Sequence, residues 1–149
     1  MPKTPTIPEN HALWPDVEKA MVTLLDDMLA GLDPPGEAYV VPPADYDDRL
    51  AKGVAIVTVQ RTGGQADRIN DTAGVNLTVT TSQRNASWDV MGWLRPQLHN
   101  YNGVVTNDDG TFAIIEKISD MQGPRRTPDI NQDMRRVTAG LNVTTRLNR

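Results

Sequence analysis

Apolar and polar residues alternate along the last quarter of the chain, from Met134 to Leu147. Successive side chains of an extended strand point to opposite faces, so this segment would carry apolar residues on one side and polar residues on the other. The apolar positions are Val137, Ala139, Leu141, Val143 and Leu147, with arginine, threonine and asparagine between them. The pattern predicts a strand with one face in a core and one face in water.

Three further strands are predicted earlier in the chain. Val54–Val59 is a β-branched run typical of a buried strand, and Thr62-Gly63-Gly64 is expected to break it and begin a loop. Gly74–Thr81 alternates apolar residues with asparagine and threonine, which predicts a strand with a polar face. Phe112–Ile118 is the third, introduced by the turn sequence Asn107-Asp108-Asp109-Gly110.

Apolar residues at helical spacing predict two helices. The first extends from Pro15 to Gly31, and the second begins after Ser82 and reaches Leu98. Pro96 lies inside the second pattern and is expected to kink the helix or to end its first half. Trp88 and Trp93 would lie about 140° apart around the same helix. We therefore expect one of them in the core and the other at a protein interface.

The order helix, strand, strand, helix, strand, strand predicts an α+β fold. We expect a single domain over residues 14–149, with a largely antiparallel or mixed four-to-five-stranded sheet and two helices packed against it. Asp33–Arg49 is expected to be mostly exposed loop, in which Tyr39–Val41 is a candidate short edge strand. Residues 1–13 contain three prolines and no hydrophobic periodicity, which is typical of a flexible arm.

Composition excludes several classes of protein. The chain has no cysteine, which rules out disulfides, thiolate nucleophiles and the common structural zinc sites. It has no apolar run near the ~20 residues of a membrane-spanning helix, and its first residues do not resemble a signal peptide. We expect a protein without membrane partners that stays in the cytoplasm of the cell that makes it.

Charge is distributed unevenly along the chain. Six arginines but only two carboxylates lie between Pro124 and Arg149, although the net charge of the whole chain is -4. The basic candidates are Arg125, Arg126, Arg135 and Arg136. The acidic residues are densest from Asp26 to Asp48, a stretch that includes Asp45, Asp47 and Asp48. Three interpretations fit: a basic surface for nucleic acid, complementary surfaces that meet between copies of one protein, or an unevenly charged solvated surface.

Residues for catalysis or cofactor binding do not form a recognisable motif in the sequence. His11 and His99 lie outside any metal or triad pattern, and His99 is better explained as a residue at a helix end. The pairs Asp26-Asp27 and Asp47-Asp48 are expected to be solvated surface, and Asp108-Asp109 to serve a turn. The sequence therefore predicts no enzyme, no cofactor and no metal. A small enzyme built around Asp47, Asp48 and His99 is the least favoured alternative.

From Trp14 to Arg149 the chain resembles the tail terminator, or tail completion, proteins of long-tailed bacteriophages. The resemblance rests on the amphipathic first helix, the strand Gly74–Thr81, the helix Ala86–Leu98, and the sequence Gly123-Pro124-Arg125-Arg126-Thr127-Pro128-Asp129 before the alternating final strand. It implies a structural subunit that closes into a ring of six copies on the finished tail tube. Such a ring stops tube polymerisation and presents a surface to the head.

The same resemblance implies the partners and the location. They are other copies of the chain, the tail tube protein and the head–tail connector, with DNA only passing through, in a virion tail assembled in the host cytoplasm. We expect Arg125 and Arg126 on an exposed loop between the last two strands, and the basic and acidic candidates as the two sides of a contact between copies. A head-completion or minor tail protein, and a sequence-nonspecific nucleic-acid-binding module, remain alternatives.

Overall fold

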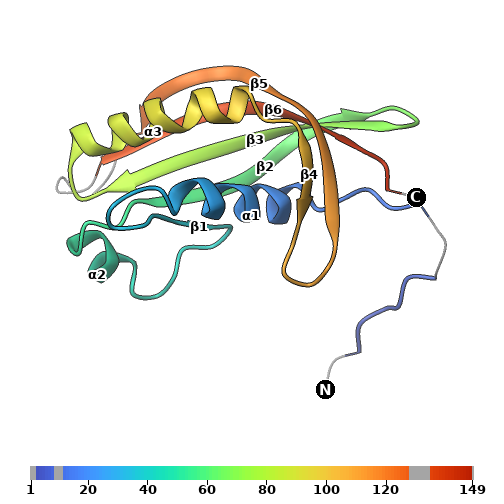
Figure 1. Ribbon diagram of the computed structural model, residues 1–149, viewed down its shortest axis with the longest axis horizontal. Helices are drawn as coiled ribbons and strands as arrows, with labels where there is room; N and C mark the ends of the chain where they lie inside the picture. Colours follow the sequence, from blue (N-terminus) through green and yellow to red (C-terminus); the bar gives the residue numbers. More distant parts are fainter. Residues whose placement is uncertain (1–2, 9–11, 128–134, 149) are drawn as a thin grey trace.

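The computed structural model of the chain describes residues 3–8, 12–127 and 135–148. Its helices are α1 (Val17–Leu29), α2 (Tyr46–Ala51) and α3 (Arg84–His99). Its strands are β1 (Glu37–Tyr39), β2 (Ile56–Ala66), β3 (Asn70–Thr81), β4 (Gly103–Thr106), β5 (Phe112–Thr127) and β6 (Arg135–Arg146). The α+β class is confirmed, and the described residues add one helix and at least one strand to the prediction (Figure 1).

The strands form one mixed, six-stranded sheet in the order β1-β2-β3-β6-β5-β4. β1 pairs with β2 in parallel, and every other neighbouring pair is antiparallel. The sheet therefore has six strands in place of the four or five predicted, because β4 was not recognised in the sequence. Its two valines are too short a run to distinguish from a loop without β5 beside them.

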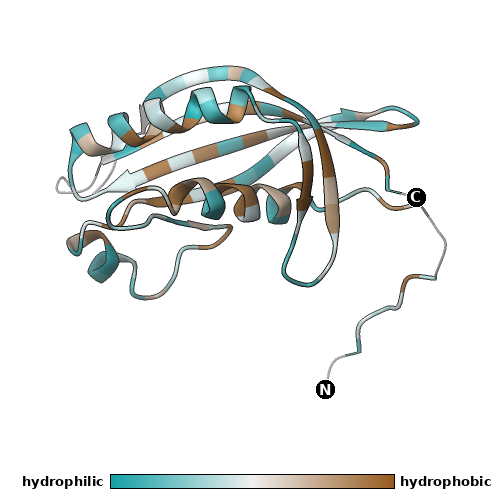
Figure 2. Ribbon diagram, viewed as in Figure 1, coloured by the Kyte–Doolittle hydropathy of each residue, from teal (hydrophilic) through white to brown (hydrophobic). Residues whose placement is uncertain are grey.

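Helices α1 and α3 cover one face of this sheet (Figure 1). Asp16 caps α1 by accepting a hydrogen bond from the Lys19 N–H at 3.1 Å, which satisfies one free donor of the first turn. Both helices contribute to one core cluster with the alternating apolar residues of β3 and β6, as the brown bands of Figure 2 show. The buried strand positions include Val75, Leu77, Val79, Val137, Ala139, Leu141 and Val143. The predicted inward face of the last strand is confirmed.

Strand β2 continues through the glycines that were expected to end it. A register shift lies between Arg61 and Gly63, after which β2 goes on pairing with β3 as far as Ala66. At Gly64 the backbone has φ +136°, and a Cβ would lie 2.1 Å from the carbonyl oxygen of Thr72. The glycine is thus needed for close strand contact rather than for a loop.

Strand β5 also extends further than predicted. It includes Gly123–Thr127, so Arg125 and Arg126 belong to a strand and not to the loop in which we expected them. Pro124, which has no N–H to donate, falls at a register shift between Gln122 and Arg125. Pro128 and Asp129, the rest of the predicted loop, lie outside the described residues.

Two features of α3 differ from the expectation: Pro96 does not end the helix, and neither tryptophan lies in the core. The helix continues past Pro96 to His99, and the Gln97 side chain donates to the Trp93 carbonyl oxygen at 3.0 Å. Gly92, whose carbonyl would have accepted from residue 96, is exposed, so water can satisfy it. Trp88 and Trp93 are 37% and 38% exposed, so neither belongs to the buried core.

The N-terminal residues 3–8 are exposed and run away from the body of the molecule (Figure 1). The chain joins the body at Leu13, which exchanges two backbone hydrogen bonds of 2.9 Å with Asn148. In the acidic segment that was expected to be loop, β1 covers Glu37–Tyr39 and α2 is a six-residue helix. None of the described helices is long and apolar enough to cross a membrane.

Candidate assembly surfaces

The face of the sheet opposite α1 and α3 is lined by polar side chains. Threonines, asparagines and glycines occupy most outward positions of β3 and β6, and two pairs of threonines lie opposite each other across the strands. The Thr78 and Thr138 hydroxyls lie 3.1 Å apart, and those of Thr72 and Thr144 lie 3.2 Å apart. Cross-strand hydroxyl pairs satisfy these groups without a partner molecule. We call this surface the polar sheet face. The Met121 side chain of β5 lies over its two glycines, Gly74 and Gly140.

Part of the polar sheet face is hollowed beside α2. Tyr46 and Pro42 form one wall of a hollow of about 330 Å³, and Thr58, Thr78, Thr80 and Arg136 complete its lining. Arg136 is half-buried there. The hollow therefore contains one of the four predicted basic residues and the aromatic residue of the acidic helix.

The other basic candidates lie in the strands that lead to this hollow. Arg125 is exposed and pairs in register with Thr138, and Thr127 pairs with Arg136. Paired residues of neighbouring strands share a face, so Arg125 and Arg136 lie on the same polar sheet face. Arg126 and Arg135 pair through their backbones with Val137 and Thr81, and their side chains lie outside the described part of the chain.

The acidic candidates are all in or next to α2. Asp45 precedes the helix and accepts a hydrogen bond of 2.8 Å from the Arg49 Nε, which lowers the pKa of Asp45. Asp47 and Asp48 are exposed in the first turn, where negative charge is favourable. Tyr46, which lies between Asp45 and Asp47 in sequence, lines the same hollow as Arg136, whereas these carboxylates do not line it.

The sequence grouped Asp26 and Asp27 with the acidic residues around α2, but the fold places them in a separate acidic surface. Asp26 and Asp27 of α1 line a hollow with Thr23 and with Asp108, which comes from the turn between β4 and β5. Burial raises the pKa of Asp26, and nearby Glu37 and Asp108 raise it further, against the lowering effect of a hydrogen bond from the Ala38 N–H. The carboxylates lie on the helix side of the molecule, away from the polar sheet face. Only the fold brings residues this distant in sequence together.

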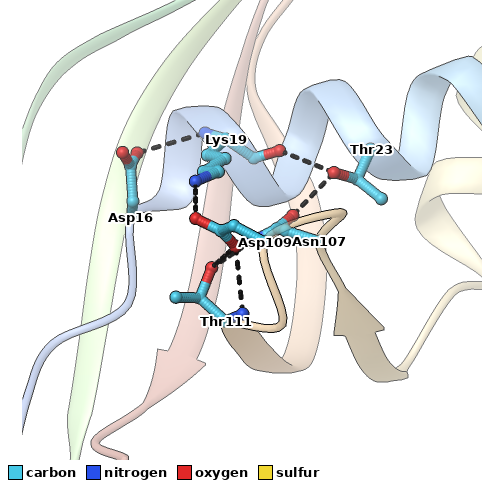
Figure 3. Close-up of polar contacts among 6 residues, drawn as sticks. All are labelled: Asp16, Lys19, Thr23, Asn107, Asp109 and Thr111. Atoms are coloured by element: carbon cyan, nitrogen blue, oxygen red, sulfur yellow. Dashed lines mark hydrogen bonds and ion pairs between the residues drawn. The ribbon is translucent and has the colours of Figure 1, made fainter.

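The turn at Asn107–Gly110 is fixed to α1 by side-chain contacts (Figure 3). Thr23 donates to the Asn107 side-chain oxygen at 2.6 Å, and Lys19 pairs with Asp109. Asp109 also accepts from the Thr111 N–H at 3.0 Å and from its hydroxyl at 2.6 Å. The predicted role of Asp108-Asp109 in a turn is confirmed.

His99 does not meet the carboxylates of α2. Its Nε2 lies 2.9 Å from Asp120, which also accepts a hydrogen bond of 2.6 Å from Arg95. Burial alone would raise the pKa of Asp120, but the hydrogen bonds from Arg95 and His99 outweigh it and lower that pKa. These contacts of Arg95 and His99 with Asp120 tie the end of α3 to β5. Among the described residues, no three His, Cys, Asp or Glu side chains are placed to hold a metal ion.

Comparison with known proteins identifies a family, although no curated protein matches the chain. The family model described as phage tail termination protein matches residues 13–149, which include every helix and strand of the fold. The match covers nearly the whole chain, and the chain therefore belongs to the family of phage tail termination proteins.

Proposed function

We propose that this chain forms a closed hexameric ring that caps the tail tube, stops its polymerisation and provides the surface to which the head joins. The ring would contact the tail tube protein on one side and the head–tail connector on the other. DNA would only pass through it, and assembly would take place in the host cytoplasm. Membership of the tail termination family over residues 13–149 is the observation that carries this proposal.

A closed ring needs two different surfaces on each copy, because each subunit contacts its neighbours head to tail. The subunit has two charged surfaces on opposite sides of the sheet. Arg125 lies on the polar sheet face, and Asp27 and Asp108 lie on the helix side. Opposite charge favours one register when two such surfaces meet. In our proposal, the polar sheet face of one copy contacts an acidic surface of the next.

Two acidic surfaces are available for that contact, and a charge exchange distinguishes them. Arg125→Glu should weaken assembly, because it places like charges at the interface. If Asp27 is the partner, adding Asp27→Arg should restore assembly, whereas adding Asp47→Arg should not. Restoration by Asp47→Arg alone would assign the contact to α2, and restoration by neither would exclude both acidic surfaces as the partner of Arg125. Unchanged assembly of the Arg125→Glu protein would remove Arg125 from the interface. Native mass measurement, in solution and on isolated tails, reports each outcome.

The function is tested by removing the protein from the phage. A terminator limits a polymer to which subunits otherwise keep adding, so particles lacking it should contain tail tubes of uncontrolled length that do not join filled heads. Electron microscopy of tail lengths measures this directly, with the gene supplied in trans as the control. Tails of normal length that fail to join heads would favour the head-completion alternative. Normal, head-joined tails would contradict the proposal.

The nucleic-acid alternative makes a different prediction. Contacts made only by arginines to phosphates are electrostatic and weaken steeply as salt rises. We expect no DNA binding by the purified protein at physiological ionic strength. Retained binding, combined with normal tails in the absence of the protein, would favour the nucleic-acid-binding module.

A further inference from the structure

Three large apolar side chains are exposed around one hollow where the N-terminal arm joins the body. Leu13, Trp14 and Phe112 are 48%, 40% and 40% exposed, and all three line a hollow of about 240 Å³. Phe112 is the single phenylalanine of the chain. Aromatic residues gathered on a surface and rimmed by polar groups are typical of an interaction site. We call this surface the arm-base hollow.

The walls of the arm-base hollow are held in place before any partner arrives. Asn148 donates its side-chain N–H to the Phe112 carbonyl oxygen at 2.7 Å and pairs through its backbone with Leu13. Asn107 and Thr111 also line the hollow. The Asn107 side-chain N–H donates a hydrogen bond of 3.1 Å to the Thr111 hydroxyl, within the turn that is held against α1 (Figure 3). The buried Oδ1 of Asn148 has no hydrogen-bond partner in the described part of the chain.

The arm has the chemistry of a segment that docks on such a surface. Prolines occupy sequence positions 2, 5 and 8, a spacing of three residues. A polyproline II helix has three residues per turn, so these prolines would share one face of it. Ile7 beside them is 55% exposed. Aromatic-lined grooves bind proline-rich segments of this kind because little conformational entropy remains to be lost.

We propose that the arm of one copy, residues 3–8, docks as a polyproline II helix in the arm-base hollow of a second copy. The arm of each copy leaves the body at Leu13, on the rim of that copy's own hollow, and is directed outward (Figure 1). At about 3.1 Å per residue, the six residues 3–8 would span roughly 19 Å as a polyproline II segment beyond the body of their own copy. Each copy would give one arm and receive one, which is a head-to-tail contact that can close a ring.

A mixed cross-linking experiment on the full chain tests this proposal, which rests on the self-association proposed above. The chain has no cysteine, so a cysteine introduced at one position reacts alone. Copies carrying Ile7→Cys are mixed with tagged copies carrying Leu13→Cys and are mildly oxidised, both in solution and in tails assembled during infection. A disulfide forms only when the two Cα atoms come within about 7 Å. Tagged copies carrying Val41→Cys, an exposed apolar residue of the loop before α2, are the matched control.

We expect several-fold more linked pairs with Leu13→Cys than with Val41→Cys. Replacing Pro5 and Pro8 by glycine in the arm should reduce that yield several-fold, because the free arm becomes more disordered. Replacing Thr4 and Thr6 by glycine, as the matched control, should reduce the yield of linked pairs less. Oligomers that give no excess over the Val41→Cys control would overturn arm docking while leaving the ring intact. A double variant, Ile7→Cys with Leu13→Cys, that links only within single chains would assign the hollow to the chain's own arm. Absence of any oligomer, in solution and on tails, would instead overturn the proposed ring.

Discussion

Arg61 and Asp71 form a two-pronged ion pair at the β2–β3 hairpin, with N–O distances of 3.0 and 2.9 Å. The Asp71 side chain is only 5% exposed, whereas Arg61 reaches it from the surface and also donates its backbone N–H to Glu18 of α1 at 3.1 Å. The ion pair thus neutralises a buried charge, and the separate backbone contact of Arg61 ties the hairpin to the first helix.

Arg61→Met should destabilise the fold strongly, because it leaves the buried Asp71 carboxylate without its counter-charge. Breaking a buried pair in this way costs about 3 kcal/mol or more. Urea unfolding followed by circular dichroism measures the change. Adding Asp71→Leu should recover much of the loss, since two apolar residues can replace a buried pair at little cost. A single variant as stable as the parent would mean that water reaches Asp71 in the folded state.

The side-chain contacts of the β4–β5 turn should contribute very different amounts to the free energy of unfolding. Asn107 is buried and bonds to Thr23 and Thr111, so Asn107→Ala should cost about 1–3 kcal/mol by leaving buried groups without partners. Lys19 and Asp109 are both exposed, and Lys19→Ala should change the free energy of unfolding by less than about 1 kcal/mol. Equal losses in the two variants, measured side by side in urea, would show that the ion pair holds the turn.

Acid should act on Asp120 and Asp26 in opposite directions. The pKa of Asp120 is lowered in the folded state, so its stabilising effect is complete above the unfolded pKa and is lost as the pH falls through the folded value. The pKa of Asp26 is raised, so its protonation favours the folded state as the pH falls. Asp120→Asn should therefore flatten the loss of stability in acid, and Asp26→Asn should steepen it. Unfolding free energies measured from neutral pH to below pH 4 test both signs, and slopes that change together would contradict the assignment.

A core change and a surface change on neighbouring strands should separate folding from assembly. Leu141 is fully buried on β6, and Leu141→Ala should cost about 2–5 kcal/mol. Arg125 is exposed on β5, and Arg125→Glu should change stability by no more than about 0.5 kcal/mol while it impairs assembly. Thermal unfolding and the complementation of phage lacking the protein give the two readouts. An Arg125→Glu protein that unfolds would mean that this part of β5 is structural.

Local sequence pattern predicted the elements whose packing follows from their own periodicity. The alternation around Leu141 identified β6 and its buried face, and helical spacing identified α1. The errors occurred where pairing with a distant segment decides the structure. Gly63-Gly64 resembles a turn locally, yet Gly64 lies against Thr72 of the next strand. Pro124 resembles the start of a loop, but a register shift accommodates it within β5.

The candidate surfaces were predictable only in part, for the same reason. The charge of Arg125 and Arg136 is visible in the sequence, but their common face follows from the pairing of β5 with β6. The acidic hollow needs Asp27 from a helix and Asp108 from a turn, residues that no spacing rule connects. The arm-base hollow likewise combines Trp14 with Phe112.

The place of β6 in the sheet has a consequence for how the protein is made. This strand is formed by the last stretch of the fold, yet it lies between β3 and β5. While the chain is still being synthesised, β3 and β5 therefore have no partner along the edges that β6 will fill. The sheet can close only after residues up to Arg146 have left the ribosome. A chain interrupted before Arg135 would keep two open strand edges and should be degraded rather than incorporated into tails.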